Sequence, residues 1–167
     1  DDTGLAYNVR KEIRVNRIRR TAGELIGEVN AVLFSAADID LVTGPPAGRR
    51  RFLDILLSQA DRLYLKGLQR YHRVVQQRNQ LLRLIREGRA EREELAFWDE
   101  ELVREGAWIT WRRYEAMREL IPTCVRHHQE LGGPDEDLAI EYRPSVRLGG
   151  SISEIEDNFR EGLGAVI

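Results

Sequence analysis

The amino-acid sequence predicts an α+β fold, in which a small sheet adjoins a protruding antiparallel helical hairpin, that is, a coiled-coil arm. Short β-type patterns near the N-terminus predict the sheet. Two long stretches with apolar residues at helical spacing, separated by Gly88, predict the hairpin. The 167 residues suffice for a core, and 42% hydrophobic with 32% charged residues is typical of a folded chain.

The first part of the chain, residues 1–46, is expected to contain the strands. One strand is predicted over residues 9–19, where side chains alternate until Ile18 breaks the pattern. A second is predicted over residues 30–34, a continuous apolar run typical of a strand that is covered on both faces. Residues 36–42 are expected to form a short helical turn, which ends at the turn-forming sequence Thr43-Gly44-Pro45-Pro46.

The arm is predicted over residues 47–131. A helix can begin at Pro46, because a proline in the first turn needs no N–H, and we expect it to cover residues 49–57. The outgoing helix of the hairpin is predicted over residues 61–87 and the return helix over residues 91–125. Spacings of four and three residues mark the seam of the outgoing helix, as in a coiled coil. The seam positions are Tyr64, Leu68, Tyr71, Val75, Arg78, Leu82 and Ile85.

A turn at residues 88–90 fixes the expected register of the two helices. It brings Val75 opposite Leu102 or Val103. It also brings Arg78 opposite Glu101 or Glu105. The last part, residues 132–167, is predicted to hold a returning strand over residues 139–142 and a helix over residues 151–163, capped by Ser151 or Ser153.

The location of the protein is expected to be cytoplasmic. No apolar run approaches the roughly 20 residues of a membrane-spanning helix. The chain begins at Asp1 without a methionine or an apolar leader, so we expect no secretory signal and expect a piece of a longer protein. One cysteine, Cys124, excludes an internal disulfide and suits a reducing compartment.

The net charge of −2 conceals an asymmetry along the chain. Residues 49–92 carry twelve basic and four acidic side chains, whereas residues 93–167 carry eight basic and seventeen acidic ones. Two interpretations follow: the two arms of the hairpin attract each other, or the basic stretch presents a face to phosphates. The first turn of a predicted helix contains three positive charges, Arg49, Arg50 and Arg51, which are unfavourable beside the positive end of the helix dipole. We therefore expect phosphates or acidic side chains as their partners.

Catalytic and metal-binding patterns are weak. No Gly-x-x-x-x-Gly-Lys phosphate loop and no nucleophile motif is present, so we expect no enzyme activity, cofactor or metal in this chain itself. Gly149 and Gly150 precede a helix and could receive an anion, although a plain turn explains them better. Cys124, His127 and His128 would suit a metallo-hydrolase, but a structural zinc site needs four ligands.

Several segments, in order along residues 29–146, have a recognisable pattern. The first ones are Val32-Leu33-Phe34-Ser35 and, after it, the acidic and turn sequence Asp38-Ile39-Asp40-Leu41-Val42-Thr43-Gly44-Pro45-Pro46. The pattern continues with Arg49-Arg50-Arg51-Phe52-Leu53-Asp54, Gln76-Gln77-Arg78-Asn79-Gln80-Leu81-Leu82, Trp98-Asp99-Glu100-Glu101-Leu102 and Glu141-Tyr142-Arg143-Pro144-Ser145-Val146. Taken together, these segments resemble the RecF family of bacterial recombination mediators.

The resemblance implies that this chain is the arm domain of an ABC-type ATPase that acts in DNA repair, recombination, replication and the SOS response. ATP and Mg²⁺ are the implied cofactors of the longer protein, called the parent protein below. DNA, single-stranded or as gapped duplex, and mediators of the RecO and RecR type are the implied partners, together with an ATP-dependent homodimer of the parent. Ser35 and Asp38 are the implied nucleotide-side residues, although Ala36-Ala37 replaces the family's usual Pro-Glu.

The function that we expect is DNA binding by the arm of a nucleoid-associated protein. This protein is expected to help load recombinase at gaps in DNA. Phosphates would be contacted by a basic track, without base reading. Its residues are Arg14, Arg17, Arg19, Arg20, Arg49, Arg50, Arg51, Lys66, Arg70 and Arg73. The alternative is a helical-hairpin module that binds a protein partner and makes no direct DNA contact. Salt-dependent DNA binding distinguishes the two.

Overall fold

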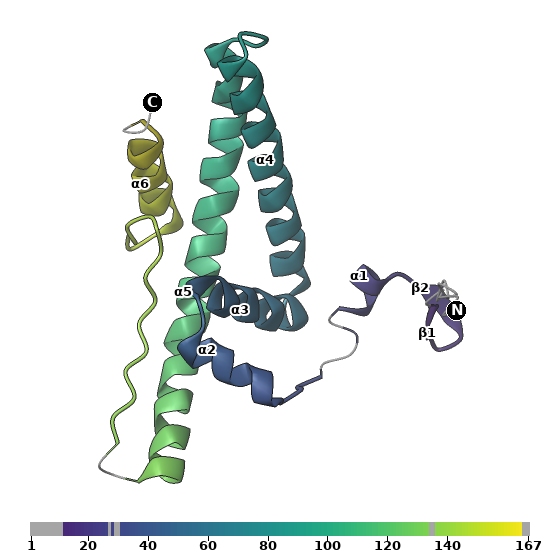
Figure 1. Cartoon of the computed structure of the whole chain (residues 1–167), viewed down its shortest axis with the longest axis vertical. Coiled ribbons are helices and arrows are strands. Elements are labelled where there is room, and N and C mark those ends of the chain that lie inside the picture. Colours follow the sequence, from purple (N-terminus) through teal and green to yellow (C-terminus); the bar gives the residue numbers. More distant parts are fainter. Residues whose placement is uncertain (1–11, 27, 29–30, 134–135, 165–167) are drawn as a thin grey trace, which may run out of the picture.

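The computed structural model describes residues 12–26, 28, 31–133 and 136–164. It confirms the α+β class with a small antiparallel sheet and a long helical hairpin. Figure 1 shows α5 between α4 and α6, with α3 crossing the foot of the hairpin. The sheet lies apart from the hairpin, beyond α1 and a connecting segment. No helix in the described part of the chain is long and apolar enough to cross a membrane.

The sheet consists of β1 (Ile13–Val15) and β2 (Ile18–Arg20), which pair in antiparallel register. The prediction of one continuous strand over residues 9–19 is therefore wrong, because a turn at residues 16–17 divides its described part into two strands. Residues 9–11 lie outside the described residues. Asn16 and Arg17 reverse the chain with φ of 51° and 69°. Two successive residues with positive φ suit a tight hairpin, but no glycine marks this turn. Helix α1 (Ala22–Leu25) follows.

The predicted strand over residues 30–34 is not formed in its described part, residues 31–34. Val32, Leu33 and Phe34 are 101%, 87% and 89% exposed. A strand forms only when a neighbouring strand accepts and donates its backbone hydrogen bonds, and the described residues place none beside this segment. The apolar run is therefore uncovered.

The helical turn that follows is confirmed as the 3₁₀ helix η1 (Ala36–Ile39) and α2 (Asp40–Thr43). Helix α3 (Pro46–Ala60) begins at the predicted proline but runs beyond residue 57, to Ala60. The chain then breaks at Asp61, whose backbone is extended and whose side chain accepts a hydrogen bond from the N–H of Leu63 at 2.7 Å. This cap starts the arm.

The hairpin consists of α4 (Arg62–Arg86), the short 3₁₀ helix η2 (Arg92–Glu94) and α5 (Leu95–Gly132). The turn contains Gly88 at φ 69°, a conformation that glycine adopts without strain, as predicted. The return helix is longer than predicted, because it continues through Pro122 to Gly132. Trp108 packs against Gly67, where an added Cβ would lie 2.4 Å from the indole.

The core lies at the foot of the hairpin. Leu53, Leu57, Tyr64 and Ile109 form one buried cluster from α3, α4 and α5. Leu82, predicted in the seam, is instead exposed near the tip. A straight helix has 3.6 residues per turn, so a seam predicted from 3.5-residue spacing drifts off the contact face along the arm.

The register differs from the prediction at Arg78, which pairs with Asp99 rather than with Glu101 or Glu105. Glu105 pairs with Arg70. Because the side chains of adjacent helices interdigitate, a shift of part of a turn is enough to change the charged partner. These two ion pairs bracket the region in which Val75 was expected to face Leu102.

The predicted strand over residues 139–142 is also absent, since this stretch is extended without a paired strand in the described part of the chain. Its side chains nevertheless alternate between half-buried and exposed positions, the period of a strand. Helix α6 (Ile152–Gly164) packs on α5 through the fully buried Ile155. Ser151 caps it, because its Oγ accepts a hydrogen bond from the N–H of Glu154 at 3.2 Å.

Candidate nucleic-acid interface

Helix α4 is the most basic element of the described chain, because every charged side chain that it carries is Lys or Arg. Three of these arginines form ion pairs. Arg62 pairs with Glu28, Arg70 with Glu105 at 2.8 Å, and Arg78 with Asp99 at 2.5 Å. The last two bridge the arms of the hairpin, so part of the basic charge holds the arms together.

Arg70 is thus engaged, although it was predicted as a DNA-binding residue. Its partner Glu105 is 7% exposed, whereas Arg70 itself is 54% exposed. The hydrogen bond from Arg70 to Glu105 raises the pKa of the guanidinium above its ordinary value. Without Arg70, the buried Glu105 would keep only the longer contact with Arg104, at 3.8 Å. We therefore assign Arg70 mainly to the hairpin.

The remaining basic residues of α4, namely Lys66, Arg73, Arg83 and Arg86, are exposed and make no ion pair with the described residues. Lys66 and Arg73 lie seven residues apart, which places them on one side of the helix, about 10 Å apart along its axis. Three exposed glutamines share that side. We call this set the outer face of α4; its residues are Lys66, Gln69, Arg73, Gln76 and Gln80.

Acidic residues gather on the opposite flank of the hairpin. Helix α6 lies on the other side of α5 from α4 (Figure 1) and exposes Glu154, Asp157 and Glu161. Arg160 joins this helix to α5 through Glu100, at 3.2 Å. The basic and acidic flanks therefore face opposite directions, so a polyanion would approach from the α4 side.

The arginines of the N-terminal sheet do not extend this basic face. Arg14 and Arg19 both contact Glu12, at 2.5 and 2.7 Å, and the hydrogen bonds from Arg19 and Arg14 lower the pKa of that carboxyl. Arg20 pairs with Glu24. Arg17 lies in the turn between the strands. Figure 1 places this sheet apart from α4, so the described arginines do not form the continuous track that we expected.

Arg49, Arg50 and Arg51 lie at the start of α3. Nη1 of Arg49 donates to the backbone oxygens of Leu41, at 3.2 Å, and Gly44, at 2.9 Å. Arg49 thus fixes the corner between α2 and α3. Arg50 and Arg51 are exposed and make no ion pair among the described residues.

Ser35 and Asp38 are joined by hydrogen bonds. The Asp38 carboxylate accepts the N–H of Ser35 at 2.6 Å and its hydroxyl at 3.2 Å, which starts η1. This capping accounts for both residue types at this spacing. A nucleotide-side role for them remains a proposal.

The structure contains a polar cluster at the foot of the arm that the sequence patterns did not predict. Asp54 of α3, Tyr64 of α4 and Arg113 of α5 contact one another, and Tyr64 donates to Asp54 at 2.6 Å. Burial, reinforced by the bond to Asp54, raises the pKa of Tyr64. Burial alone would lower the pKa of Arg113. The interactions with Tyr64 and Asp54 raise this pKa by more, so that it lies above its ordinary value. Burial also raises the pKa of Tyr142 in the extended segment nearby.

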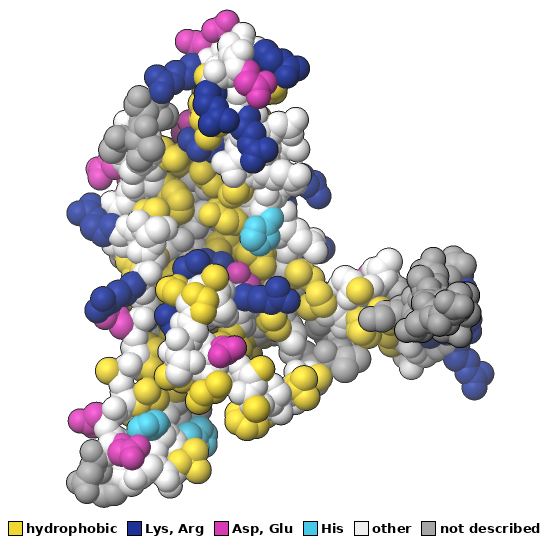
Figure 2. Space-filling view, viewed as in Figure 1, with side chains coloured by type: hydrophobic (Ala, Val, Ile, Leu, Met, Phe, Trp, Pro, Cys, Tyr) yellow, Lys and Arg dark blue, Asp and Glu magenta, His cyan; other side chains and the backbone are white. Residues whose placement is uncertain are grey.

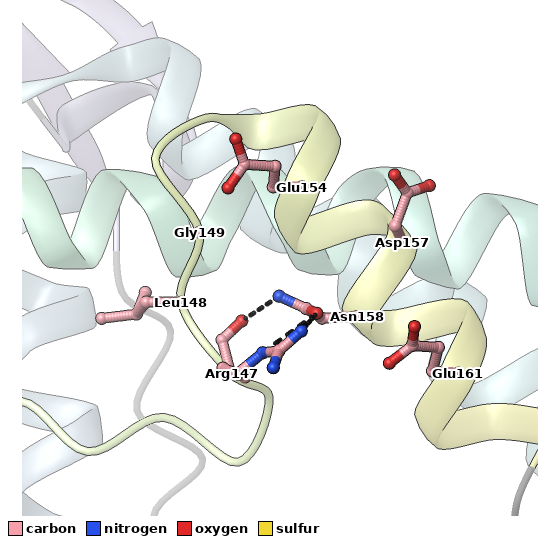
Figure 3. A pocket seen from close by; sticks show the side chains of 7 residues that line it. All are labelled: Arg147, Leu148, Gly149, Glu154, Asp157, Asn158 and Glu161. Atoms are coloured by element: carbon pink, nitrogen blue, oxygen red, sulfur yellow. Dashed lines mark hydrogen bonds between the residues drawn. The ribbon is translucent and has the colours of Figure 1, made fainter.

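A hollow of about 330 Å³ lies at the start of α6 (Figure 3). Arg147 donates to Asn158 at 2.8 Å, and Asn158 donates back to the Arg147 carbonyl at 2.9 Å. The Gly150 N–H donates to the Glu154 carboxylate at 2.9 Å, so the chain's own acid takes the position that an anion would occupy. The hollow is otherwise lined by Leu148, Gly149, Asp157 and Glu161. It does not suit a phosphate.

The proposed metal ligands do not converge in the described part of the chain. His127 contacts Glu130 at 2.9 Å, and His128 approaches Glu136 at 3.7 Å. No group of three or more His, Cys, Asp or Glu residues that could hold a metal ion occurs among the described residues.

Comparison with known proteins identifies the family of the chain. No family model matches it. The DNA replication and repair protein RecF of Herpetosiphon aurantiacus is 47% identical over 84% of this chain, and that of Roseiflexus castenholzii is 44% identical over 86%. Two solved structures, described as the recombination mediator protein RecF-ATPrS and RecF-ATP in the RecFOR pathway, superpose with TM-scores of 0.84 and 0.85, at 28% and 29% identity.

These matches cover most of this chain but only part of each relative. The chain spans 37% and 38% of the lengths of the two RecF sequences. It spans 43% and 42% of the two solved chains and is itself covered to 95% and 94%. The chain therefore belongs to the RecF family and corresponds to a part of its members.

Proposed function

We propose that the parent protein binds DNA in repair and recombination and that the outer face of α4 contacts the phosphate backbone. The observation that carries this proposal is the pair Lys66 and Arg73, which are exposed on a helix without acidic residues and make no ion pair with the described residues. Exposed cations on the same face of a helix can bind phosphates without reading bases. The neighbouring glutamines can donate hydrogen bonds to phosphate oxygens.

Arg83 and Arg86 extend the same positive charge toward the tip of the hairpin, where they too are exposed. Arg50 and Arg51 are less suited to this role, because they lie at the foot beside apolar side chains rather than on α4. The acidic flank formed by α6 repels a second DNA segment from the far side. The hairpin is therefore proposed to bind DNA along one side only.

The parent protein is further proposed to bind ATP with Mg²⁺ and to act with mediators of the RecO and RecR type as an ABC-type ATPase. The support comes from the relatives, one of which was solved as RecF-ATP in the RecFOR pathway. In this chain, Asp38 would lie on the nucleotide side, but its carboxylate is held by Ser35. No chemical step is assigned to the residues of this chain.

The test is DNA binding by the full-length parent protein as a function of salt. Lys66→Ala combined with Arg73→Ala should weaken binding to duplex DNA and reduce the slope of log K against log salt by about 2, because each lost phosphate contact changes it by about 0.9. A charge-matched control, Arg118→Ala with Arg126→Ala on α5, should leave the slope unchanged. Equal effects of the two pairs would point to net charge, and an unchanged slope in both would favour the protein-interaction alternative.

A further inference from the structure

Helix α3 has two apolar faces, and the hairpin covers only one of them. Leu53 and Leu57 point into the core, and Asp54 joins the polar cluster on the arm. Phe52, Ile55 and Leu56 lie on the opposite side. They are 46%, 47% and 39% exposed. We call these three residues the outer face of α3. A helix that is apolar on two sides is normally buried on both.

The exposed apolar surface continues from α3 onto the segments that precede it. Ile39 and Val42 of η1 and α2 are exposed beside the corner that Arg49 holds. The uncovered run of residues 31–34 leads into them. Figure 2 shows hydrophobic side chains gathered over α2 and α3 below the hairpin. A contiguous patch of this kind marks a contact surface rather than a surface made for water.

The chain itself indicates what covers this surface. The run of residues 31–34 has the composition of a strand between two layers, and such a strand needs sheet neighbours as well as cover. This chain spans about two fifths of the lengths of its relatives. A single further body of the same polypeptide can supply both the sheet and the apolar cover. A second copy of this chain would bring another uncovered run in place of a sheet.

We propose that the outer face of α3 is the docking surface for the remainder of the parent polypeptide, which covers it with an apolar surface. Arg50 and Arg51, exposed beside it, fit carboxylates at the rim of that contact. The inner side of α3 is tied to the arm by Asp54 and Arg113. Helix α3 thereby connects the rest of the protein rigidly to the hairpin. This inference does not depend on DNA binding.

The test uses the unmodified full-length parent protein and hydroxyl-radical footprinting, which oxidises side chains that water reaches. The chain offers a matched set of one residue type: Phe34, Phe52 and Phe97 are 89%, 46% and 61% exposed in this structure. Phe97 lies near the tip of the hairpin and serves as the exposed control. Phe159, which packs over Gly106, serves as the protected one.

Phe34 and Phe52 should be oxidised at least about fivefold more slowly than Phe97 in the native parent protein, and at equal rates after unfolding. The protection should be independent of protein concentration. Oxidation of Phe52 as fast as that of Phe97 would overturn the proposal. Protection that disappears on dilution would also overturn it, because a second copy would then be the cover. No DNA is present, so the result is separate from the test of DNA binding.

Discussion

Arg113 on α5 binds both carboxylate oxygens of Asp54 on α3 through Nη2, at 2.7 and 2.9 Å. Nε of the same guanidinium lies 2.9 Å from Oδ1 of Asp54. Both side chains are 17% exposed. A charge-assisted fork of this kind fixes direction as well as distance. This pair therefore sets how α3 crosses the foot of the hairpin.

Removing one partner of this pair should be costly. Asp54→Ala leaves the Arg113 guanidinium largely buried without its carboxylate, so the free energy of unfolding should fall by about 2–4 kcal/mol. Denaturant unfolding measures this change. Adding Arg113→Leu to Asp54→Ala should recover part of the loss. Glu141→Ala is the control, because its pair with Arg143 is exposed, and it should leave the free energy of unfolding nearly unchanged. Similar costs for Asp54→Ala and Glu141→Ala would contradict the assigned role.

The raised pKa of Tyr64 predicts a pH dependence. The folded state keeps the Tyr64 proton to higher pH than the unfolded state does, since burial and Asp54 disfavour the phenolate. The corresponding stability is complete below pH about 10, the ordinary tyrosine pKa, and declines as the pH rises above it. Tyr64→Phe should remove this decline. The measurement is the difference in unfolding free energy between wild type and Tyr64→Phe at pH 8 and pH 11; a constant difference would exclude the shift.

The contact between Gly67 and Trp108 predicts a steric effect on the arm. Gly67→Ala places a methyl group 2.4 Å from the Trp108 ring, so the two helices must separate or the indole must turn. Thermal or denaturant unfolding should show a loss of about 1–3 kcal/mol. Gly162→Ala in α6 is the matched control, because nothing lies within 4 Å of its added Cβ. It should be neutral or stabilising. A loss at Gly162 equal to that at Gly67 would remove the packing explanation.

The sequence was informative where the signal is local. Helical periodicity and the turn at Gly88 predicted the hairpin, and Pro46 and Ser151 marked helix starts correctly. The predictions of strands over residues 30–34 and 139–142 were wrong. A strand needs a neighbouring strand, and residues 31–34 and 139–142 have none in the described part of the chain. The hairpin turn at Asn16 and Arg17 escaped notice because it contains no glycine.

The candidate interface was predictable only in part. Helical spacing placed Lys66 and Arg73 on one face, as the structure has them. The same spacing could not show that Glu105 holds Arg70, because that contact depends on the register between two helices. Asp54 and Arg113 are 59 residues apart in the sequence, and neither belongs to a spacing pattern that would link them. Such contacts follow from tertiary packing alone.

Mapping where DNA lies on the hairpin by crosslinking tests the central claim most directly. In the full-length parent protein, a photo-crosslinker attached at Gln76→Cys lies on the outer face of α4, and one at Glu161→Cys lies on the acidic flank of α6; both native side chains are exposed. Irradiation with bound duplex DNA should give crosslinks from position 76 that Lys66→Ala with Arg73→Ala reduces, and few from position 161. Crosslinks from position 161 alone, or from neither position while DNA remains bound, would contradict the account.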